Sequence, residues 1–279
     1  MSEHEEDDAE RASPRSREHQ QLVALGPGAN EHAEAEHEER LASPVHTWTG
    51  SRRLVVVYNS ATREVSMARD IYTEPEGFDL DTLRNLGPLT PLAGTWEGEG
   101  TDTHPVAEGT KDEPYRERVI FEPIDPQPNG PQLLYGLRYH IHINKLDEQL
   151  TFHDQVGYWL WEPATSTIFQ TLAIPRGQVA MAMGTAQPDA RRFTVKATLG
   201  SPVAGIVSAP FLHENSLRTI EYSITITVNE DGTLLYEQDT VLQVAGRPEP
   251  FHHTDRNLLR RTAAPQPNPA LLADAAAGR

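Results

Sequence analysis

The stretch Ser216-Leu-Arg-Thr-Ile-Glu-Tyr-Ser-Ile-Thr-Ile-Thr-Val228 alternates between apolar and polar side chains. Its even positions from Ile220 to Val228 are isoleucine, tyrosine or valine, and its odd positions are threonine, serine or glutamate. Successive side chains of a β-strand point to opposite faces, so this period of two predicts a strand with one dry face and one wet face. The same count places Arg218 on the apolar face, near the start of the strand.

Nine more segments between Leu92 and Thr262 resemble this strand, and turns rich in proline, glycine, asparagine and aspartate separate them. Strands are expected at 92–101, 115–124, 132–143, 149–162, 167–176, 179–187, 191–200, 216–230, 233–244 and 250–262. A sheet of this size protects its edges best by closing on itself. The sequence therefore predicts an all-β protein, an antiparallel up-and-down β-barrel of about ten strands, similar to lipocalins, whose interior has room for a small ligand.

The residues outside the predicted barrel have a different character. Residues 1–40 contain 12 acidic and 4 basic residues, a net charge of -8, and residues 1–46 are predicted to be a disordered acidic tail. Residues 47–86 are expected to form a short β-hairpin, over 53–58 and 64–69, and a short helix over 79–86. The barrel is assigned to 87–265, and a flexible tail is assigned to 266–279.

The composition excludes several functional classes. The chain has no cysteine, which removes disulfides and thiolate chemistry, and its formal net charge of -17 opposes binding to nucleic acid. No apolar run approaches the roughly 20 residues of a membrane helix, and the acidic N-terminus does not resemble a secretion signal. We expect a cytoplasmic protein without a membrane partner. No nucleophile elbow or phosphate-binding loop is present, so a cofactor would have to supply any chemistry.

The predicted barrel opens with Gly94-Thr-Trp96-Glu-Gly98-Glu-Gly100. Trp96 is suited to close the barrel floor, and the three glycines share its strand face and leave space beside it. This motif resembles the opening strand of the nitrobindin family, whose members are heme-binding β-barrels similar to fatty-acid-binding proteins. The resemblance continues, in the family's order, through Phe152–Trp159, Thr171–Gly177 and Phe251–Arg260.

The resemblance implies heme b bound through one histidine near the C-terminal end of the barrel. In the family this histidine is followed at five and seven residues by a leucine and a basic residue, and here Leu258 and Arg260 fit that spacing from His253. The family's spacing from the preceding Gly-x-Pro, here Gly246-Arg-Pro248, instead selects His252. Adjacent strand residues face opposite sides, so the two registers exclude each other. We favour His253 as the axial ligand of the heme iron, with His252 as the alternative. The other predicted cofactor-binding residues are Gly94, Trp96, Gly98, Gly100 and Arg218, the last as a partner for a heme propionate at the barrel mouth.

What the resemblance implies about activity is a ferric heme with an open distal position, which binds nitric oxide and isomerises peroxynitrite to nitrate. The expected partners are heme and a small diatomic or peroxynitrite ligand. Catalytic residues are not assigned by the sequence, and it leaves open whether two barrels form a homodimer.

Two other functions remain open. A barrel of this kind also suits a carrier of fatty acids or other small hydrophobic ligands. His140 and His142 share the polar face of one predicted strand and, with Glu148 and His253, loosely imitate the motifs of metal-dependent cupin enzymes. The spacing from histidine to glutamate is one residue too long for a cupin, so two solvent-facing histidines are the simpler interpretation.

Overall fold

The computed structural model describes residues 70–215 and 217–278. The acidic tail and the hairpin predicted before residue 70 lie outside these residues. The strands are β1 (Gly94–Pro105), β2 (Thr110–Pro123), β3 (Gln127–Asn129), β4 (Gln132–Lys145), β5 (Thr151–Glu162), β6 (Thr167–Ile174), β7 (Gln178–Thr185), β8 (Arg192–Thr198), β9 (Ile206–Ser208), β10 (Leu217–Val228), β11 (Leu234–Val244) and β12 (Phe251–Ala263).

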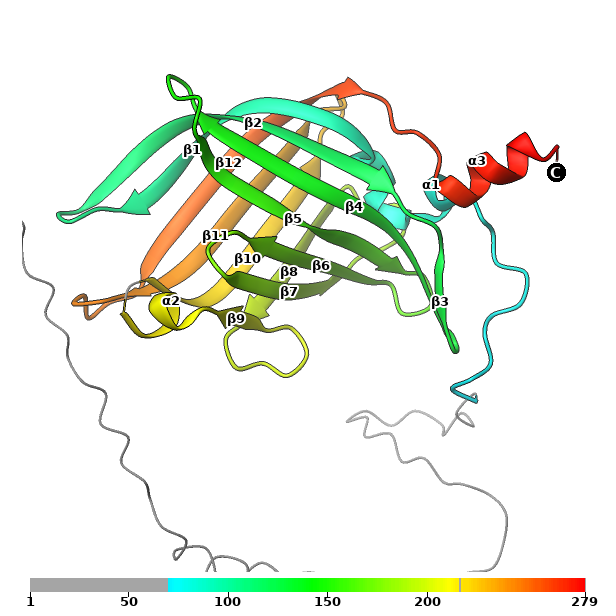
Figure 1. The fold of residues 1–279 in the computed structure, drawn as a ribbon, viewed down its shortest axis with the longest axis horizontal. Helices are drawn as coiled ribbons and strands as arrows, with labels where there is room; N and C mark the ends of the chain where they lie inside the picture. The colour runs from blue at the N-terminus through cyan, green and yellow to red at the C-terminus, as the bar shows by residue number, and fades with distance from the viewer. Residues whose placement is uncertain (1–69, 216, 279) are drawn as a thin grey trace, which may run out of the picture. The chain divides into compact units, whose positions relative to one another are not determined.

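The long strands form one closed antiparallel barrel (Figure 1). Each pairs with its neighbour in the order β2-β1-β12-β11-β10-β8-β7-β6-β5-β4, and a further pairing between β2 and β4 closes the ring of ten. Chain neighbours are therefore barrel neighbours, which is the up-and-down arrangement. The predicted fold class is confirmed, and each of the ten predicted strands is present, with ends shifted by a few residues.

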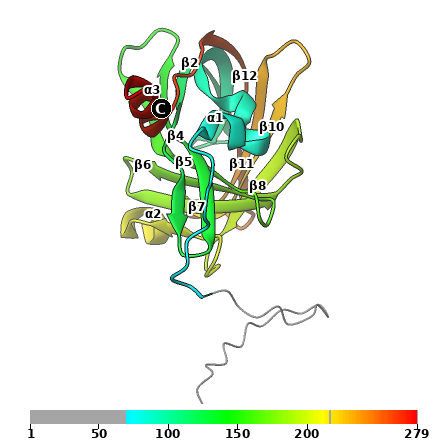
Figure 2. The same ribbon diagram turned by 90° about the vertical axis from the view of Figure 1, so that its right-hand side faces the viewer.

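Helical segments close the end of the barrel where β1 begins (Figure 2). Helix α1 (Thr82–Asn85) is capped by Asp81, and the 3-10 helix η1 (Gly87–Leu92) follows it. The predicted helix is thus shorter than 79–86. It ends before Gly87, whose backbone is left-handed with a φ of 55°. Pro88 then lies in the first turn of η1, where proline is well tolerated. Leu86, Leu89 and Leu92 are fully buried against the barrel floor.

Besides β3 and η1, three short elements were not apparent from the sequence. Strand β9 pairs with β7, and helix α2 (Pro210–Asn215) follows it. Where a flexible tail was predicted, helix α3 (Pro269–Ala276) is present, and the residue that precedes it, Asn268, is buried. The Asn268 side chain accepts a hydrogen bond from Thr82 N at 3.2 Å, and Asp125 accepts one from Ala270 N at 2.7 Å. These long-range bonds tie the segment to the barrel.

Candidate functional site in the barrel interior

The inward faces of the strands enclose a cavity of about 390 Å³. This volume lies within the range of small-molecule sites in proteins. Much of the wall is apolar and includes Val119, Phe121, Ile141, Ile143, Trp159, Leu172, Ile224 and Ile226. Histidine, carboxylate and phenol side chains line the remainder, mainly from β1, β2, β11 and β12. A mostly apolar cavity with a few convergent polar groups is typical of a ligand site.

The two adjacent histidines of β12 face opposite sides of the wall. His253 lines the cavity and is partly buried, and its Nε2 lies 2.6 Å from Oδ1 of Asp102 on β1. His252 points outward, with 64% of its side chain exposed, and its Nδ1 lies 2.8 Å from Oδ2 of Asp239. Of the two registers that the sequence left open, only the one with His253 brings an imidazole to the cavity.

Asp102 connects two histidines at the cavity. Its second carboxylate oxygen lies 2.7 Å from Nδ1 of His104, which also lines the cavity. Burial tends to raise the pKa of Asp102, but the hydrogen bonds and charges of His253 and His104 outweigh it and hold the pKa below its usual value. The carboxylate therefore fixes one ring nitrogen of His253, and Nδ1 is the nitrogen left to donate a lone pair. Sequence reasoning missed Asp102, because it lies 151 residues from its partner.

A second polar cluster lies deeper in the barrel, around Glu117 of β2. Tyr236 Oη and Asn257 Nδ2 donate to Glu117 Oε2 at 2.8 and 2.7 Å. The hydroxyl oxygens of Tyr115 and Tyr236 are 2.8 Å apart, and the Tyr115 hydroxyl also donates to Asp255. Burial, followed by the charge of Asp255, raises the pKa of Glu117 to about 7, and burial raises the pKa of Asp255 to about 6. Two buried carboxyl groups thus share one hydrogen-bonded network, and Glu117 Oε1 has no partner in it.

Two glycines of β1, Gly98 and Gly100, make room for this cluster and do not line the cavity. A Cβ atom at Gly100 would collide with the hydroxyl of Tyr115, and one at Gly98 would lie 2.7 Å from Asn257 Oδ1. Trp96 is 1% exposed and closes the floor, as expected. None of Gly94, Trp96, Gly98 and Gly100 lines the cavity, so the structure lends no support to the prediction that they bind the cofactor. Protein side chains occupy the space that Gly98 and Gly100 leave.

Arg218 does not line the cavity either. A β-bulge between Thr219 and Glu221 shifts the pairing of β10 with β11. The cavity-lining positions of β10 are odd before this bulge and even after it. Thr219 is consequently buried and lines the cavity, whereas Arg218 is exposed. The arginine that does line the cavity is Arg176, which follows β6 and is itself largely exposed. The count along the strand could not reveal a bulge, which depends on the partner strand.

His153 is a further cavity residue that the sequence did not single out. It lies on β5 near the mouth, and burial lowers its pKa despite the weak contact with Gln155 at 3.4 Å. A buried imidazole with a lowered pKa is neutral at pH 7, so it can donate or accept a hydrogen bond from a ligand. Its inward direction follows from strand parity, because the neighbouring Asp154 points outward.

The cupin hypothesis does not fit the structure. His140 and His142 lie on the outer face of β4, and neither lines the cavity. A cupin barrel is a double-sheet jelly roll, whereas the present strands follow one another around the ring. The solvent-facing interpretation of the two histidines is therefore the right one.

The raised pKa of Glu117 predicts a pH-dependent stability. Between an unfolded pKa near 4.5 and a folded pKa of about 7, only the folded protein holds the proton. Stability therefore falls as pH rises through this window, by about 1.4 kcal/mol per pH unit. Glutamine does not titrate, so Glu117→Gln should not lose this stability. We expect its free energy of unfolding, relative to that of the wild type, to increase by roughly 2–3 kcal/mol from pH 5 to pH 8. Urea unfolding at the two pH values measures this.

The matched control for this prediction is Glu122→Gln on the same strand, because Glu122 is exposed and pairs with Arg138 at the surface. Its stability relative to the wild type should change little between the two pH values. The prediction would be contradicted if the free energy of unfolding of Glu117→Gln, relative to that of the wild type, were the same at pH 5 and at pH 8.

A closed antiparallel barrel with a ligand-sized cavity, and with two cavity-lining histidines held by one carboxylate, defines a small-molecule-binding β-barrel protein. A family described as "THAP4-like, heme-binding beta-barrel domain" matches residues 85–261, which is more than half of the chain. The chain belongs to this family of heme-binding β-barrel domains. A heme-binding domain is thus supported, in agreement with the resemblance seen in the sequence.

Among solved structures, the chain is similar to the crystal structure of Rv2717c from M. tuberculosis. The sequence identity is 21% and the TM-score is 0.47, and the match covers 66% of this chain and 99% of the other.

Among the described residues, none of the helices has the length and apolar character needed to cross a bilayer.

Proposed function

We propose that this protein binds heme b in its barrel with His253 as the axial ligand, and that the bound heme binds nitric oxide and isomerises peroxynitrite to nitrate. The observation that carries the proposal is the inward imidazole of His253, which Asp102 holds at 2.6 Å through one ring nitrogen. A carboxylate partner orients a metal-ligating histidine and raises the basicity of the other nitrogen.

The residues present suit a heme group. The apolar wall offers a dry surface for a flat macrocycle, and His253 offers a nitrogen donor of the kind that iron takes in many heme proteins. Arg176 is exposed at the edge of the cavity, where a cation can pair with a propionate in contact with water. We therefore assign to Arg176 the role that the sequence suggested for Arg218.

Each of these residues acts through binding or positioning. Asp102 sets the orientation of His253, and the apolar wall excludes water from the site. His153 supplies a neutral imidazole, which can hydrogen-bond to a small ligand held inside the cavity. When bound, the heme supplies the iron at which nitric oxide binds and peroxynitrite is converted to nitrate.

A titration of the purified full chain with hemin tests the proposal. We expect a sharpened and shifted Soret band that saturates at one hemin per chain, and faster conversion of peroxynitrite to nitrate by the loaded protein than by free hemin. Displacement of a bound fluorescent fatty acid without a saturable Soret change would instead indicate a lipid carrier and overturn the heme proposal. Soret saturation without faster peroxynitrite decay would overturn only the isomerase part.

A further inference from the structure

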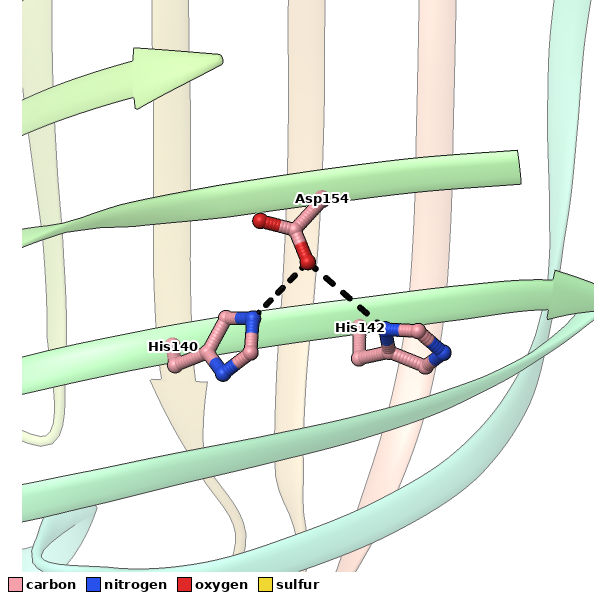
Figure 3. A group of neighbouring side chains, drawn as sticks. All are labelled: His140, His142 and Asp154. Atoms are coloured by element: carbon pink, nitrogen blue, oxygen red, sulfur yellow. Dashed lines mark hydrogen bonds and ion pairs between the residues drawn. The ribbon is translucent and has the colours of Figure 1, made fainter. Parts of the chain in front are cut away.

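Three side chains on the outer face of the barrel converge on one point (Figure 3). His140 and His142 are two residues apart on β4, so both point outward, and Asp154 stands opposite His142 on β5. Oδ2 of Asp154 lies 2.9 Å from Nε2 of His140 and 3.6 Å from Nδ1 of His142. Figure 3 shows both rings turned toward this single carboxylate oxygen.

This spacing is close to that of ligands around a bound metal ion. Bonds of about 2.0–2.1 Å from zinc to nitrogen or oxygen, in tetrahedral geometry, place neighbouring ligand atoms roughly 3.3 Å apart. The two distances measured from Asp154 Oδ2 lie on either side of that value, and one donor atom from each of the three residues lies within 4.8 Å of the others. Small side-chain rotations would therefore complete a three-ligand site without any movement of the strands.

The charges around the three residues also suit a cation. Asp154 is partly exposed and, like an ordinary aspartate, is a carboxylate at neutral pH. Two neighbouring arginines have their own anionic partners. Arg118, opposite His142 on β2, lies 3.5 Å from Glu97, and Arg138, two residues before His140 on β4, lies 2.8 Å from Glu122. The chain as a whole carries a formal charge of -17.

We propose that His140, His142 and Asp154 form a surface binding site for a late first-row divalent metal ion such as Zn²⁺. Two imidazoles and one carboxylate favour zinc, nickel or copper over magnesium or calcium, which prefer oxygen ligands. Between a third and a half of each of the three side chains is exposed, which leaves water free to fill the remaining coordination positions. This site is separate from the cavity and does not depend on heme.

The site lies directly behind the cavity wall. Ile141, between the two histidines, and His153, next to Asp154, both point inward and line the cavity. A metal ion held by His140, His142 and Asp154 therefore cross-links β4 to β5 at the wall that the ligand contacts. Zinc should raise the thermal midpoint of the wild type in the absence of heme.

The test is a Zn²⁺ titration of the full heme-free chain by calorimetry, with Co²⁺ as a spectroscopic substitute. The chain contains other histidines, so the result is a difference between proteins. We expect the wild type to bind one more equivalent of Zn²⁺ than the His140→Ala/His142→Ala double variant, and to show visible Co²⁺ absorption bands that the variant lacks. Asp154→Asn should weaken binding at this site at least about tenfold, since even outer-shell changes cost 10–100-fold.

His252→Ala is the matched control, because His252 also pairs with an aspartate on the outer face. Its neighbour His253 faces inward, and among the described residues His252 belongs to no three-ligand cluster. It should bind Zn²⁺ as the wild type does. The hemin titration and the circular dichroism spectrum of the double variant should match those of the wild type, which shows that the variant is folded. Equal Zn²⁺ stoichiometry and affinity in the wild type and the folded double variant would overturn the proposal.

Discussion

Hemin should bind the His253→Ala variant at least about 100-fold more weakly than the wild type, and the Soret band of the complex should lose the features of a histidine-ligated heme. The substitution removes the ligand itself, and loss of a mere outer-shell partner already costs 10–100-fold in metal affinity. The variant should fold normally, because His253 contacts the cavity and is not part of the packed floor. Hemin titration followed by Soret absorbance gives both readouts.

Two further variants sharpen this experiment. His252→Ala removes the neighbouring outward imidazole and should leave hemin affinity unchanged. Asp102→Asn should give an intermediate loss, because it keeps the ligand but weakens the group that orients it. The assignment of His253 fails if His253→Ala binds hemin with the wild-type affinity and spectrum, or if His252→Ala shows the greater loss.

Trp96→Ala should destabilise the fold by about 3–5 kcal/mol, the range for truncation of a large buried aromatic side chain. Trp96 is 1% exposed, its Nε1 donates to the carbonyl of Leu92 at 2.7 Å, and the guanidinium of Arg261 lies 4.6 Å from its ring. The substitution leaves a cavity at the floor and a carbonyl without its donor. Urea unfolding of the heme-free protein measures the loss as a shift of the midpoint.

The comparison variant is Leu150→Ala, in the turn between β4 and β5, where the leucine is 78% exposed. Its stability should stay within about 0.5 kcal/mol of the wild type. A loss below about 1 kcal/mol for Trp96→Ala would show that the floor does not depend on this residue.

Trp96→Ala and His253→Ala probe opposite ends of the barrel. Trp96 packs with the floor formed by η1, whereas His253, Asp102 and His104 lie where β12 begins and β1 ends. Each variant should therefore affect one property much more than the other. Trp96→Ala should change the unfolding midpoint much more than it changes the hemin affinity of the protein that remains folded. His253→Ala should change the hemin affinity much more than the unfolding midpoint. The packed floor at the η1 end stabilises the barrel, so the opposite end can contain polar groups that pack less well.

The acidic cluster around Glu117 shows what such polar groups cost. A buried carboxyl with one unpaired oxygen destabilises a fold unless it holds a proton, which is why its pKa is raised to about 7. Tyr236 and Asn257 donate to the other oxygen of Glu117, and Tyr115 donates to the neighbouring Asp255. This network is built from β2, β11 and β12, which close the barrel beside β1, where the glycines leave room.

The amino-acid sequence by itself determined the barrel strands and their order, because a period of two and the turn residues between strands are local properties of the chain. It also placed Trp96 in the core and showed that only one of His252 and His253 can face inward. It predicted no contact between His253 and Asp102, because nothing local relates residues 151 positions apart.

Only the tertiary structure decided which histidine faces the cavity and which arginine lines it. The bulge in β10 reversed the expected direction of Arg218, since a strand's parity changes when one strand gains a residue relative to its partner. Closure of the barrel then brought Asp102, Glu117 and Asp255 together from three strands. Local patterns fix which faces of a strand are apolar, whereas register between strands fixes which side chains meet.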